Sequence, residues 1–307
     1  MSNYKDYGLT LAGFAGDFPR LFKSRLEAIF IWSWSTTIAC MIAGRGFPPL
    51  VPTLTVILAA VLVTASVYIY NDIIDADMDR LNENKTGRPI ANGTVSKASA
   101  MLFVVLTGLS GLALSYLVSL PTFAICLSWF IVFTLYSIPI VRLKKRFIIK
   151  EVTTSSGQIF TALMGGFAVS NAFNVSVIFA GLVFWLFTFL GLPAFADTLD
   201  VKEDALFGVR TIGRALDWRR KVQLMGVGVL FMMTVMPLTY AQFGFNVILP
   251  IASVTMGLIF LRWGIMPLMG NYDAALVLRG RRIFTIYVLA TQVVIIISTM
   301  NLGWGLF

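Results

Sequence analysis

Nine long apolar segments constrain this chain more than any other feature of its sequence. A helix needs about 20 mostly apolar residues to cross the roughly 30 Å hydrocarbon core of a bilayer. Hydrophobic residues make up 58% of the 307 residues and charged residues only 13%, whereas an average soluble domain carries about 25% charged residues. We therefore expect a single membrane domain over residues 1–307. The candidate spans are 27–44, 50–71, 99–119, 121–141, 150–170, 175–196, 222–241, 246–263 and 283–302.

The basic residues predict how these segments are threaded. With the N-terminus in the cytoplasm, Arg45 is the only Lys or Arg that nine spans leave on the outer side, as the positive-inside rule favours. We predict an all-α, polytopic membrane protein with nine transmembrane helices around a central cavity. Residues 1–25 form a cytoplasmic N-terminal segment that lacks the long apolar run of a signal peptide. Further cytoplasmic segments are expected near 72–98, 142–149, 197–221 and 264–282.

Missing residue types exclude several kinds of site. The chain has no histidine, so a histidine-based metal site or general base is excluded. Its two cysteines, Cys40 and Cys126, lie within apolar stretches, where separate thiols form neither a disulfide framework nor a zinc site. The net charge of +9 is assigned to membrane topology, and no nucleic-acid partner is expected.

An acidic motif closes the second apolar segment. Asn71, Asp75 and Asp79 are spaced four residues apart, and Asp72 stands three residues before Asp75. On an α-helix these spacings align the side chains along one stripe. Because like charges repel at such spacing, we expect the stripe to bind a cation.

A second acidic motif follows the sixth apolar segment, where Asp197, Asp200 and Asp204 repeat the i, i+3, i+7 spacing. Both stripes are predicted at the same membrane face, where they can oppose each other across a cavity. Oxygen ligands without histidine or cysteine favour Mg2+ over zinc or copper, and Mg2+ commonly bridges carboxylates to substrate phosphates. The two motifs therefore predict a Mg2+-bridged diphosphate site.

Basic residues and glycines follow each acidic motif, in segments 84–93 and 208–214. Arginine can contact phosphate with two parallel hydrogen bonds, and lysine supplies a mobile charge. A single acidic cluster can instead be the start of a solvated loop. We interpret four other acidic residues in that way, namely Asp77, Glu83, Glu203 and Asp217. Two matching stripes favour a functional site, because carboxylates near the membrane are usually functional.

The ordered set of motifs resembles the UbiA superfamily of intramembrane prenyltransferases over about residues 20–300. Asn71, Asp75 and Asp79 match the family's NxxxDxxxD, and the second aspartate stripe matches its second motif. Segment 88–93 resembles the RPxxxG element, and segment 135–146 resembles the YSxP…RLKR stretch. Segment 208–211 resembles a GxKT-like tail, with arginine where lysine is common. Nine helices is also the family's number.

The resemblance implies roles for individual residues. Two Mg2+ ions and the diphosphate would be bound by Asn71, Asp75, Asp79, Asp200 and Asp204, with Asp72 and Asp197 in support. Diphosphate oxygens would also contact Arg88, Lys144 and Arg210. The expected catalytic residues are Asp75, Asp79, Asp200, Asp204, Tyr136 and Lys144. Tyr136 would stabilise positive charge near the allylic carbon with its ring face, unless it is only an interfacial aromatic residue. Arg20 and Arg25 are further candidates for substrate contact.

The motifs look most like those of archaeal digeranylgeranylglyceryl phosphate synthases. That likeness implies transfer of a geranylgeranyl chain from its diphosphate to geranylgeranylglyceryl phosphate, with release of pyrophosphate, at the cytoplasmic face of a prokaryotic cell membrane. An aromatic quinone-precursor or carotenoid acceptor stays open, as does cyclisation of one prenyl diphosphate by a UbiA-type terpene cyclase. An ion-coupled transporter is the alternative outside enzymes, although transporter sites usually lie near the membrane midplane.

Overall fold

The computed structural model describes residues 11–82, 85–196 and 212–301, and all regular elements within these ranges are helical. Eight helices in these ranges are long and apolar enough to cross a membrane, judged by length and composition. The prediction of an all-α, polytopic membrane protein is confirmed. The long helices are α2 (Leu26–Ala43), α3 (Leu50–Asp79), α4 (Lys97–Val118), α5 (Leu120–Ser137), α6 (Ile149–Ser170), α7 (Val175–Gly191), α11 (Trp218–Thr239), α12 (Ile248–Phe260) and α13 (Ala274–Thr299).

Helix α6 occupies the fifth predicted span but is not among those eight apolar helices. Its first turns carry polar and charged residues, including Glu151, Thr153, Ser155 and Gln158, and all four are buried. The helix packs against α2, α5 and α7. A helix that is surrounded by other helices needs less apolar surface than one that faces lipid, which explains this composition.

Helix α3 is long enough to carry the first acidic motif beyond the hydrocarbon core. It has 30 residues, which at about 1.5 Å per residue is roughly 45 Å, against a core of roughly 30 Å. The expected helical stripe is therefore real. The part of the predicted cytoplasmic segment 72–98 that carries the motif is helical, and α3 ends only at Asp79.

Most of the predicted cytoplasmic segment 264–282 is helical. Helix α12 continues into a π-turn, η3 (Leu261–Ile265), and a 3-10 turn, η4 (Met266–Met269). Helix α13 then begins at Ala274, because the Asp273 carboxylate accepts hydrogen bonds from the backbone N–H groups of Ala275 and Leu276 at 2.7 and 3.2 Å. A polar, arginine-containing sequence is thus helical here, and only residues 270–273 form the connection.

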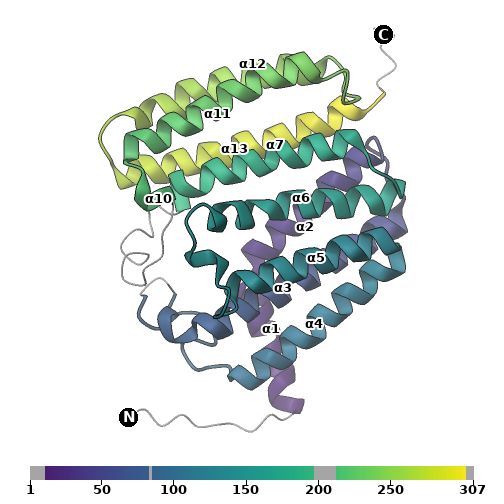
Figure 1. Ribbon diagram of the computed structural model, residues 1–307, viewed down its shortest axis with the longest axis vertical. Coiled ribbons are helices and arrows are strands. Elements are labelled where there is room, and N and C mark those ends of the chain that lie inside the picture. Colours follow the sequence, from purple (N-terminus) through teal and green to yellow (C-terminus); the bar gives the residue numbers. More distant parts are fainter. Residues whose placement is uncertain (1–10, 83–84, 197–211, 302–307) are drawn as a thin grey trace.

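The connections between helices differ in length at the two ends of the bundle (Figure 1). Short turns join α2 to α3, α4 to α5 and α6 to α7, and Ser119 alone separates α4 from α5. The longer connections, which join α3 to α4 and α5 to α6, lie at the opposite end, on the left of Figure 1. This end also holds a short 3-10 turn, η1 (Leu143–Lys145), and a short helix, α10 (Ile212–Ala215). The polar sequence is therefore gathered at one end of the bundle.

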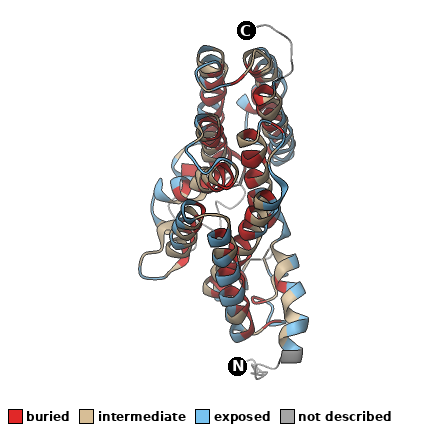
Figure 2. Cartoon of the chain, turned by 90° about the vertical axis from the view of Figure 1, so that its right-hand side faces the viewer, coloured by how far each residue is buried: buried red, intermediate tan, exposed pale blue. Residues whose placement is uncertain are grey.

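Close packing of small residues brings α2 and α6 together at the centre of the bundle. A Cβ atom added to Gly165 would lie 2.7 Å from the Cβ of Ala39 and 2.8 Å from the carbonyl oxygen of Thr36. Small residues permit such approach between helices in lipid. Buried residues occupy the inward sides of the helices along the bundle, and exposed ones the outside (Figure 2).

The N-terminal segment contains a helix that the sequence analysis did not predict, α1 (Leu11–Ser24). Phe14, Phe18 and Leu21 face the bundle, and the Phe18 ring lies 4.7 Å from that of Phe103 in α4, centroid to centroid. The Asp17 carboxylate accepts a 2.8 Å hydrogen bond from Ser99 at the start of α4. Helix α1 is thereby fixed beside the end of the bundle that carries the acidic motif.

Candidate active site

The first acidic stripe is buried although it consists of carboxylates. Asp72, Asp75 and Asp79 are 2%, 8% and 3% exposed. The side chain of Asp77, which points away from the stripe, is 74% exposed and pairs with Arg80 and Lys97 at 3.3 and 3.5 Å. Buried carboxylates need compensating partners, and α3 alone supplies none.

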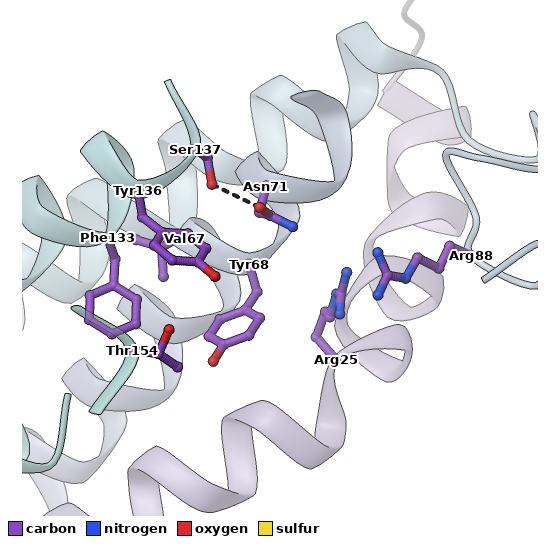
Figure 3. A pocket seen from close by; sticks show the side chains of 9 residues that line it. All are labelled: Arg25, Val67, Tyr68, Asn71, Arg88, Phe133, Tyr136, Ser137 and Thr154. Atoms are coloured by element: carbon purple, nitrogen blue, oxygen red, sulfur yellow. Dashed lines mark hydrogen bonds between the residues drawn. The ribbon is translucent and has the colours of Figure 1, made fainter. Parts of the chain in front are cut away.

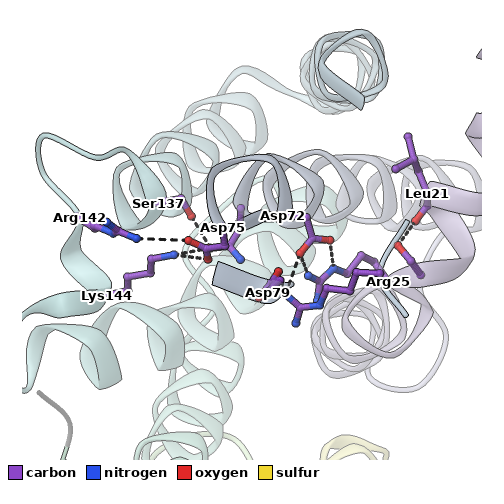
Figure 4. A network of polar contacts seen from close by, with 11 residues as sticks. Leu21, Arg25, Asp72, Asp75, Asp79, Ser137, Arg142 and Lys144 are labelled. Atoms are coloured by element: carbon purple, nitrogen blue, oxygen red, sulfur yellow. Dashed lines mark hydrogen bonds and ion pairs between the residues drawn. The ribbon is translucent and has the colours of Figure 1, made fainter. Parts of the chain in front are cut away.

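Two arginines compensate Asp72 and Asp79, on one side of the stripe (Figure 4). Arg25, between α1 and α2, donates from Nε to Asp72 at 2.7 Å and forms a second contact through its Nη2. Arg88, in the loop after α3, donates to Asp72 at 3.1 Å and to Asp79 at 2.5 Å. Arg88 therefore bridges two carboxylates that are two helical turns apart.

The loop between α5 and α6 compensates the other side of the stripe, at Asn71 and Asp75 (Figure 4). Lys144 donates a short hydrogen bond to Asp75, and its Nζ lies 3.3 Å from the Asn71 side-chain oxygen. That oxygen also accepts from Ser137 at 2.8 Å. Arg142 lies 3.6 Å from Asp75. Three of the residues assigned to the diphosphate site, Asn71, Arg88 and Lys144, thus meet on one stripe.

Burial alters the acidity of two cations that pair with the stripe, Arg25 and Lys144. The pKa of Arg25 is lowered to about 10, first because burial disfavours its charge and second because Arg88 repels it. Burial also lowers the pKa of Lys144, while Asp75 opposes that change. Both groups lie outside the spanning segments. For each, burial disfavours the charged form, and nearby carboxylates favour it.

A cavity of about 220 Å³ opens beside the stripe (Figure 3). The guanidinium groups of Arg25 and Arg88 lie on one side of it, and the rings of Tyr68 and Tyr136 on the other. The full set of lining residues is Arg25, Val67, Tyr68, Asn71, Arg88, Phe133, Tyr136, Ser137 and Thr154. Tyr136 is therefore part of the cavity wall together with the predicted diphosphate ligands.

A second cavity of about 630 Å³ adjoins the first, and Arg25, Tyr68 and Thr154 line both. Its wall is mostly apolar and is formed by α2, α7 and α13, with contributions from α3 and α6. Representative lining residues are Ile31, Trp34, Phe187, Phe284 and Leu289. A charged chamber thus adjoins a larger, mostly apolar one, which agrees with the predicted central cavity.

The described donor set suits a hard divalent cation but is incomplete. No group of three or more Asp, Glu or Cys side chains with metal-binding geometry occurs within the described ranges. Asn71, Asp75 and Asp79 offer only oxygen ligands, as Mg2+ prefers, and the Asp75 Oδ1 accepts no hydrogen bond from the described residues. These residues therefore fit one half of a Mg2+ site. The predicted second half, Asp197, Asp200 and Asp204, lies outside the described residues, as does Arg210.

The sequence analysis understated some residues and missed others. Arg25 was only a further candidate, yet it contacts the stripe and lines both cavities. Tyr68 and Thr154 were missed. Tyr68 precedes Asn71 by three residues, so helical spacing already placed it on the same face. Thr154 belongs to the polar run that opens α6, which was a second available signal.

These features define an integral, multi-pass membrane protein with a charged site at one end of its helices. Its sequence matches the model of the UbiA prenyltransferase family over residues 33–277. The chain therefore belongs to the UbiA prenyltransferase family, as the motifs predicted. This membership favours an enzyme over the transporter alternative.

Solved structures support the same fold. The structure described as "Structural and mechanistic insights into the biosynthesis of Digeranylgeranylglyceryl phosphate synthase in membranes" superposes with a TM-score of 0.76 at 19% identity, covering 94% of this chain and 99% of that one. A UbiA homologue from Archaeoglobus fulgidus bound to GPP and Mg2+ gives a TM-score of 0.62 at 14% identity, covering 88% and 98%. At such identities the likeness concerns the fold.

Curated relatives carry two different names. A 4-hydroxybenzoate octaprenyltransferase from Vesicomyosocius okutanii is 26% identical over 185 residues, 60% of this chain and 65% of that protein. A protoheme IX farnesyltransferase 2 from Pseudomonas putida is 30% identical over 139 residues, 45% and 46% of the two chains. This chain thus matches less than two thirds of the length of these relatives.

Proposed function

We propose that this chain is an intramembrane prenyltransferase that moves an isoprenoid chain from a prenyl diphosphate to a lipophilic acceptor and releases pyrophosphate. The observation that carries the proposal is the junction of two cavities, one bordered by Arg25, Arg88 and Asn71 of the α3 stripe, the other mostly apolar. A prenyl diphosphate has the same two parts, a charged head and an apolar tail. The whole chain, residues 1–307, would act as one membrane domain.

The acidic stripes would hold the diphosphate through Mg2+. Two ions would be bound by Asn71, Asp75, Asp79, Asp200 and Asp204, with Asp72 and Asp197 in support. When bound, Mg2+ would neutralise negative charge on the diphosphate as it leaves. Carboxylates that bind metal no longer need their arginine and lysine partners, so Arg88 and Lys144 would turn to the diphosphate oxygens, and Arg210 would join them.

Bond cleavage then depends on charge stabilisation at both ends of the breaking bond. The allylic carbon–oxygen bond breaks, and its electron pair leaves with pyrophosphate, which the cations stabilise. The positive charge left on the allylic carbon is stabilised by the ring face of Tyr136. The acceptor forms the new bond to that carbon and gives up a proton. The surrounding helices exclude water, which would otherwise capture the carbocation.

The preferred substrates are geranylgeranyl diphosphate and geranylgeranylglyceryl phosphate. Support comes from the motifs in segments 71–82 and 88–96, and from the TM-score of 0.76 with the structure described for a digeranylgeranylglyceryl phosphate synthase. Arg281 at the rim of the apolar cavity would suit the acceptor's phosphate. An aromatic acceptor is the second candidate, favoured by the relatives named 4-hydroxybenzoate octaprenyltransferase.

The reaction would take place at the cytoplasmic face of a prokaryotic cell membrane. The end of the bundle with the acidic stripe also holds Arg88, Lys144 and Lys145. Such a concentration of basic residues is typical of cytoplasmic segments. With nine spans, counting α6 as the fifth, both acidic motifs would lie on this side.

A product assay tests the function. The purified chain is incubated in detergent with Mg2+, geranylgeranyl diphosphate and either geranylgeranylglyceryl phosphate or 4-hydroxybenzoate, and mass spectrometry reports the product. We expect a digeranylgeranyl ether lipid that requires Mg2+ and is lost in Asp75→Ala and Asp200→Ala. A prenylated aromatic product would show that the acceptor is aromatic. A cyclic terpene made without any acceptor would show that the chain is a cyclase. An absence of pyrophosphate release with every donor tried would refute the prenyltransferase.

A further inference from the structure

Glu151 is a fully buried carboxylic acid that belongs to neither cavity wall. It is the third residue of α6, is 0% exposed, and is not among the residues that line the two cavities. Burial of such a group costs free energy unless it is hydrogen-bonded. The first turn of a helix lowers this cost, because the helix dipole favours negative charge there. The structure shows which part of the chain uses the carboxyl group.

The Glu151 side chain holds the first residue of α10. Its Oε1 accepts a buried 2.7 Å hydrogen bond from the backbone N–H of Ile212, which is 61 positions away in the sequence. The first four N–H groups of a helix have no partner within it, and α10 has only four residues. A buried N–H group needs an acceptor. Glu151 therefore supplies from α6 an acceptor that α10 itself lacks.

Lys221 of α11 holds α10 at a second point. Its Nζ donates to the carbonyl oxygen of Gly213 at 2.8 Å, and the residue is 6% exposed. A helix of a single turn is not stable by itself, so the position of α10 depends on contacts of this kind. Glu151 and Lys221 together fix one N–H group and the next C=O group to two long helices, α6 and α11.

This anchor limits where the second acidic motif can lie, through the covalent chain. The motif belongs to segment 197–211, which lies outside the described residues. The described chain before that segment ends in a π-turn, η2 (Leu192–Ala196), and α10, which follows the segment, packs against η2. Arg210 stands two residues before Ile212, and two residues of extended chain span at most about 7 Å. The position of Ile212 thus restricts the position of Arg210.

From this arrangement we infer that Glu151 is a positioning residue of the proposed prenyltransferase. Helix α6 packs against η1, which carries Lys144. The same helix therefore contacts the loop of the first acidic stripe and, through Glu151, the chain end of the second motif. Glu151 acts through the backbone of Ile212 and does not touch the substrate. The inference rests on the proposed function and adds to it a residue that lies outside every motif of the sequence.

Hydrogen exchange tests the anchor without any ligand. The whole chain in detergent is placed in deuterated buffer, and mass spectrometry follows peptides that contain Ile212. Glu151→Leu removes the acceptor, and we expect exchange there to become about tenfold faster, as for the loss of one hydrogen bond. Glu151→Gln keeps a side-chain oxygen that can accept and should stay within about twofold of the wild type.

Ser176→Ala is the matched control for this measurement. The Ser176 hydroxyl donates to the carbonyl oxygen of Phe243 at 2.6 Å, so it also joins a helix to a distant backbone segment. That contact joins the start of α7 to the connection between α11 and α12. Its loss should leave exchange at Ile212 unchanged.

Ligand binding tests the positioning itself. Isothermal titration gives the affinity for a non-hydrolysable geranylgeranyl diphosphate analogue and the Mg2+ concentration needed for half-maximal binding. We expect Glu151→Leu to weaken analogue binding about tenfold and to raise the Mg2+ requirement, while Glu151→Gln stays within about twofold. Lys221→Met, which removes the second contact, should act in the same direction, and it keeps the test possible if Glu151→Leu does not fold. Ser176→Ala should bind like the wild type.

The outcomes separate the anchor, the positioning and the reaction. Wild-type exchange at Ile212 in Glu151→Leu overturns the anchor. Faster exchange with wild-type affinity and Mg2+ requirement, in both Glu151→Leu and Lys221→Met, shows that the contacts only support the fold and overturns the positioning. A wild type that binds the analogue with Mg2+ but releases no pyrophosphate from geranylgeranyl diphosphate refutes the reaction alone, since the affinities of the variants still decide the positioning. A wild type that does not bind the analogue overturns both.

Discussion

The two adjoining cavities differ in how their polar groups are satisfied. Beside the smaller one, each carboxylate of the α3 stripe contacts at least one described cation: Asp72 with Arg25, Asp75 with Lys144 and Asp79 with Arg88. Around the larger one the wall is mostly apolar, and the side-chain oxygen of Gln158 accepts no hydrogen bond from the described residues. Ion pairs line one region, and mostly apolar side chains line the other.

This difference indicates that one region binds the charged head of a substrate and the other its apolar tail. Paired charges in a poorly solvated site are costly to separate, so we expect the ion pairs of the stripe to persist unless a ligand with its own charges replaces them. An apolar wall offers no such directional contact and selects by volume. Variants in the two regions should therefore fail in different ways.

The largest effect is expected at the centre of the charged region. Asp75→Ala removes the carboxylate that faces both Lys144 and Arg142, and we expect turnover to fall by about 10²- to 10³-fold, as for other preorganised electrostatic groups. Pyrophosphate release in the presence of Mg2+ measures it. Asp77→Ala is the matched control, because that side chain lies on the same helix but is 74% exposed. Equal activity in the two variants would contradict the assignment of the stripe.

The second effect concerns stability rather than turnover. Arg88→Ala leaves Asp79 without its described cation and Asp72 with Arg25 alone. Removal of one partner of a buried ion pair costs about 3 kcal/mol, so the unfolding temperature in detergent should fall clearly. Arg20→Ala is the control. The Arg20 side chain is 62% exposed, and its contact with Asp17, at 3.7 Å, is long for an ion pair. If both variants unfold at the same temperature, the Arg88 bridge between Asp72 and Asp79 does not stabilise the fold.

The charged region was largely predictable from sequence, and the reason is local. Helical spacing alone aligns Asn71, Asp75 and Asp79 on one face. The contact between Arg25 and Asp72 joins residues 47 positions apart, and it depends on how α2 packs on α3, which no spacing pattern encodes. For the same reason the position of Tyr68 could be predicted from spacing along one helix. Its place beside Thr154 of α6, at the junction of the two cavities, could not.

Helix α13 begins nine residues before the predicted span 283–302, because a cap and not hydropathy sets its first residue. Segment 274–282 contains three arginines and reads as a loop, yet the Asp273 cap starts α13 before them. Arginine has a good helix propensity, and its long side chain can reach the membrane surface from within a helix. Hydropathy locates the apolar core of a span, while the helix itself extends further.

The third effect should appear as selectivity in the apolar region. Thr188→Trp on α7 would fill part of the larger cavity, which Thr188 lines. We expect the ratio of kcat/KM for geranylgeranyl over geranyl diphosphate to fall about tenfold, within the range of one misfitted apolar group. Leu182→Trp, on the exposed side of the same helix, is the control. An equal loss of kcat/KM for both donors would show that the prenyl tail does not bind in the larger cavity.

The smallest effect is expected where a charge pair stands at the rim of the apolar region. Glu27 and Arg281 lie 3.5 Å apart, and their side chains are 80% and 49% exposed. Exposed pairs contribute about 0.5 kcal/mol or less, so Glu27→Gln should change donor KM by about twofold at most. Raising the salt concentration should remove even that difference. A loss in Glu27→Gln as large as that of Asp75→Ala would show that charge, not shape, governs this cavity too, and the contrast between the two regions would be wrong.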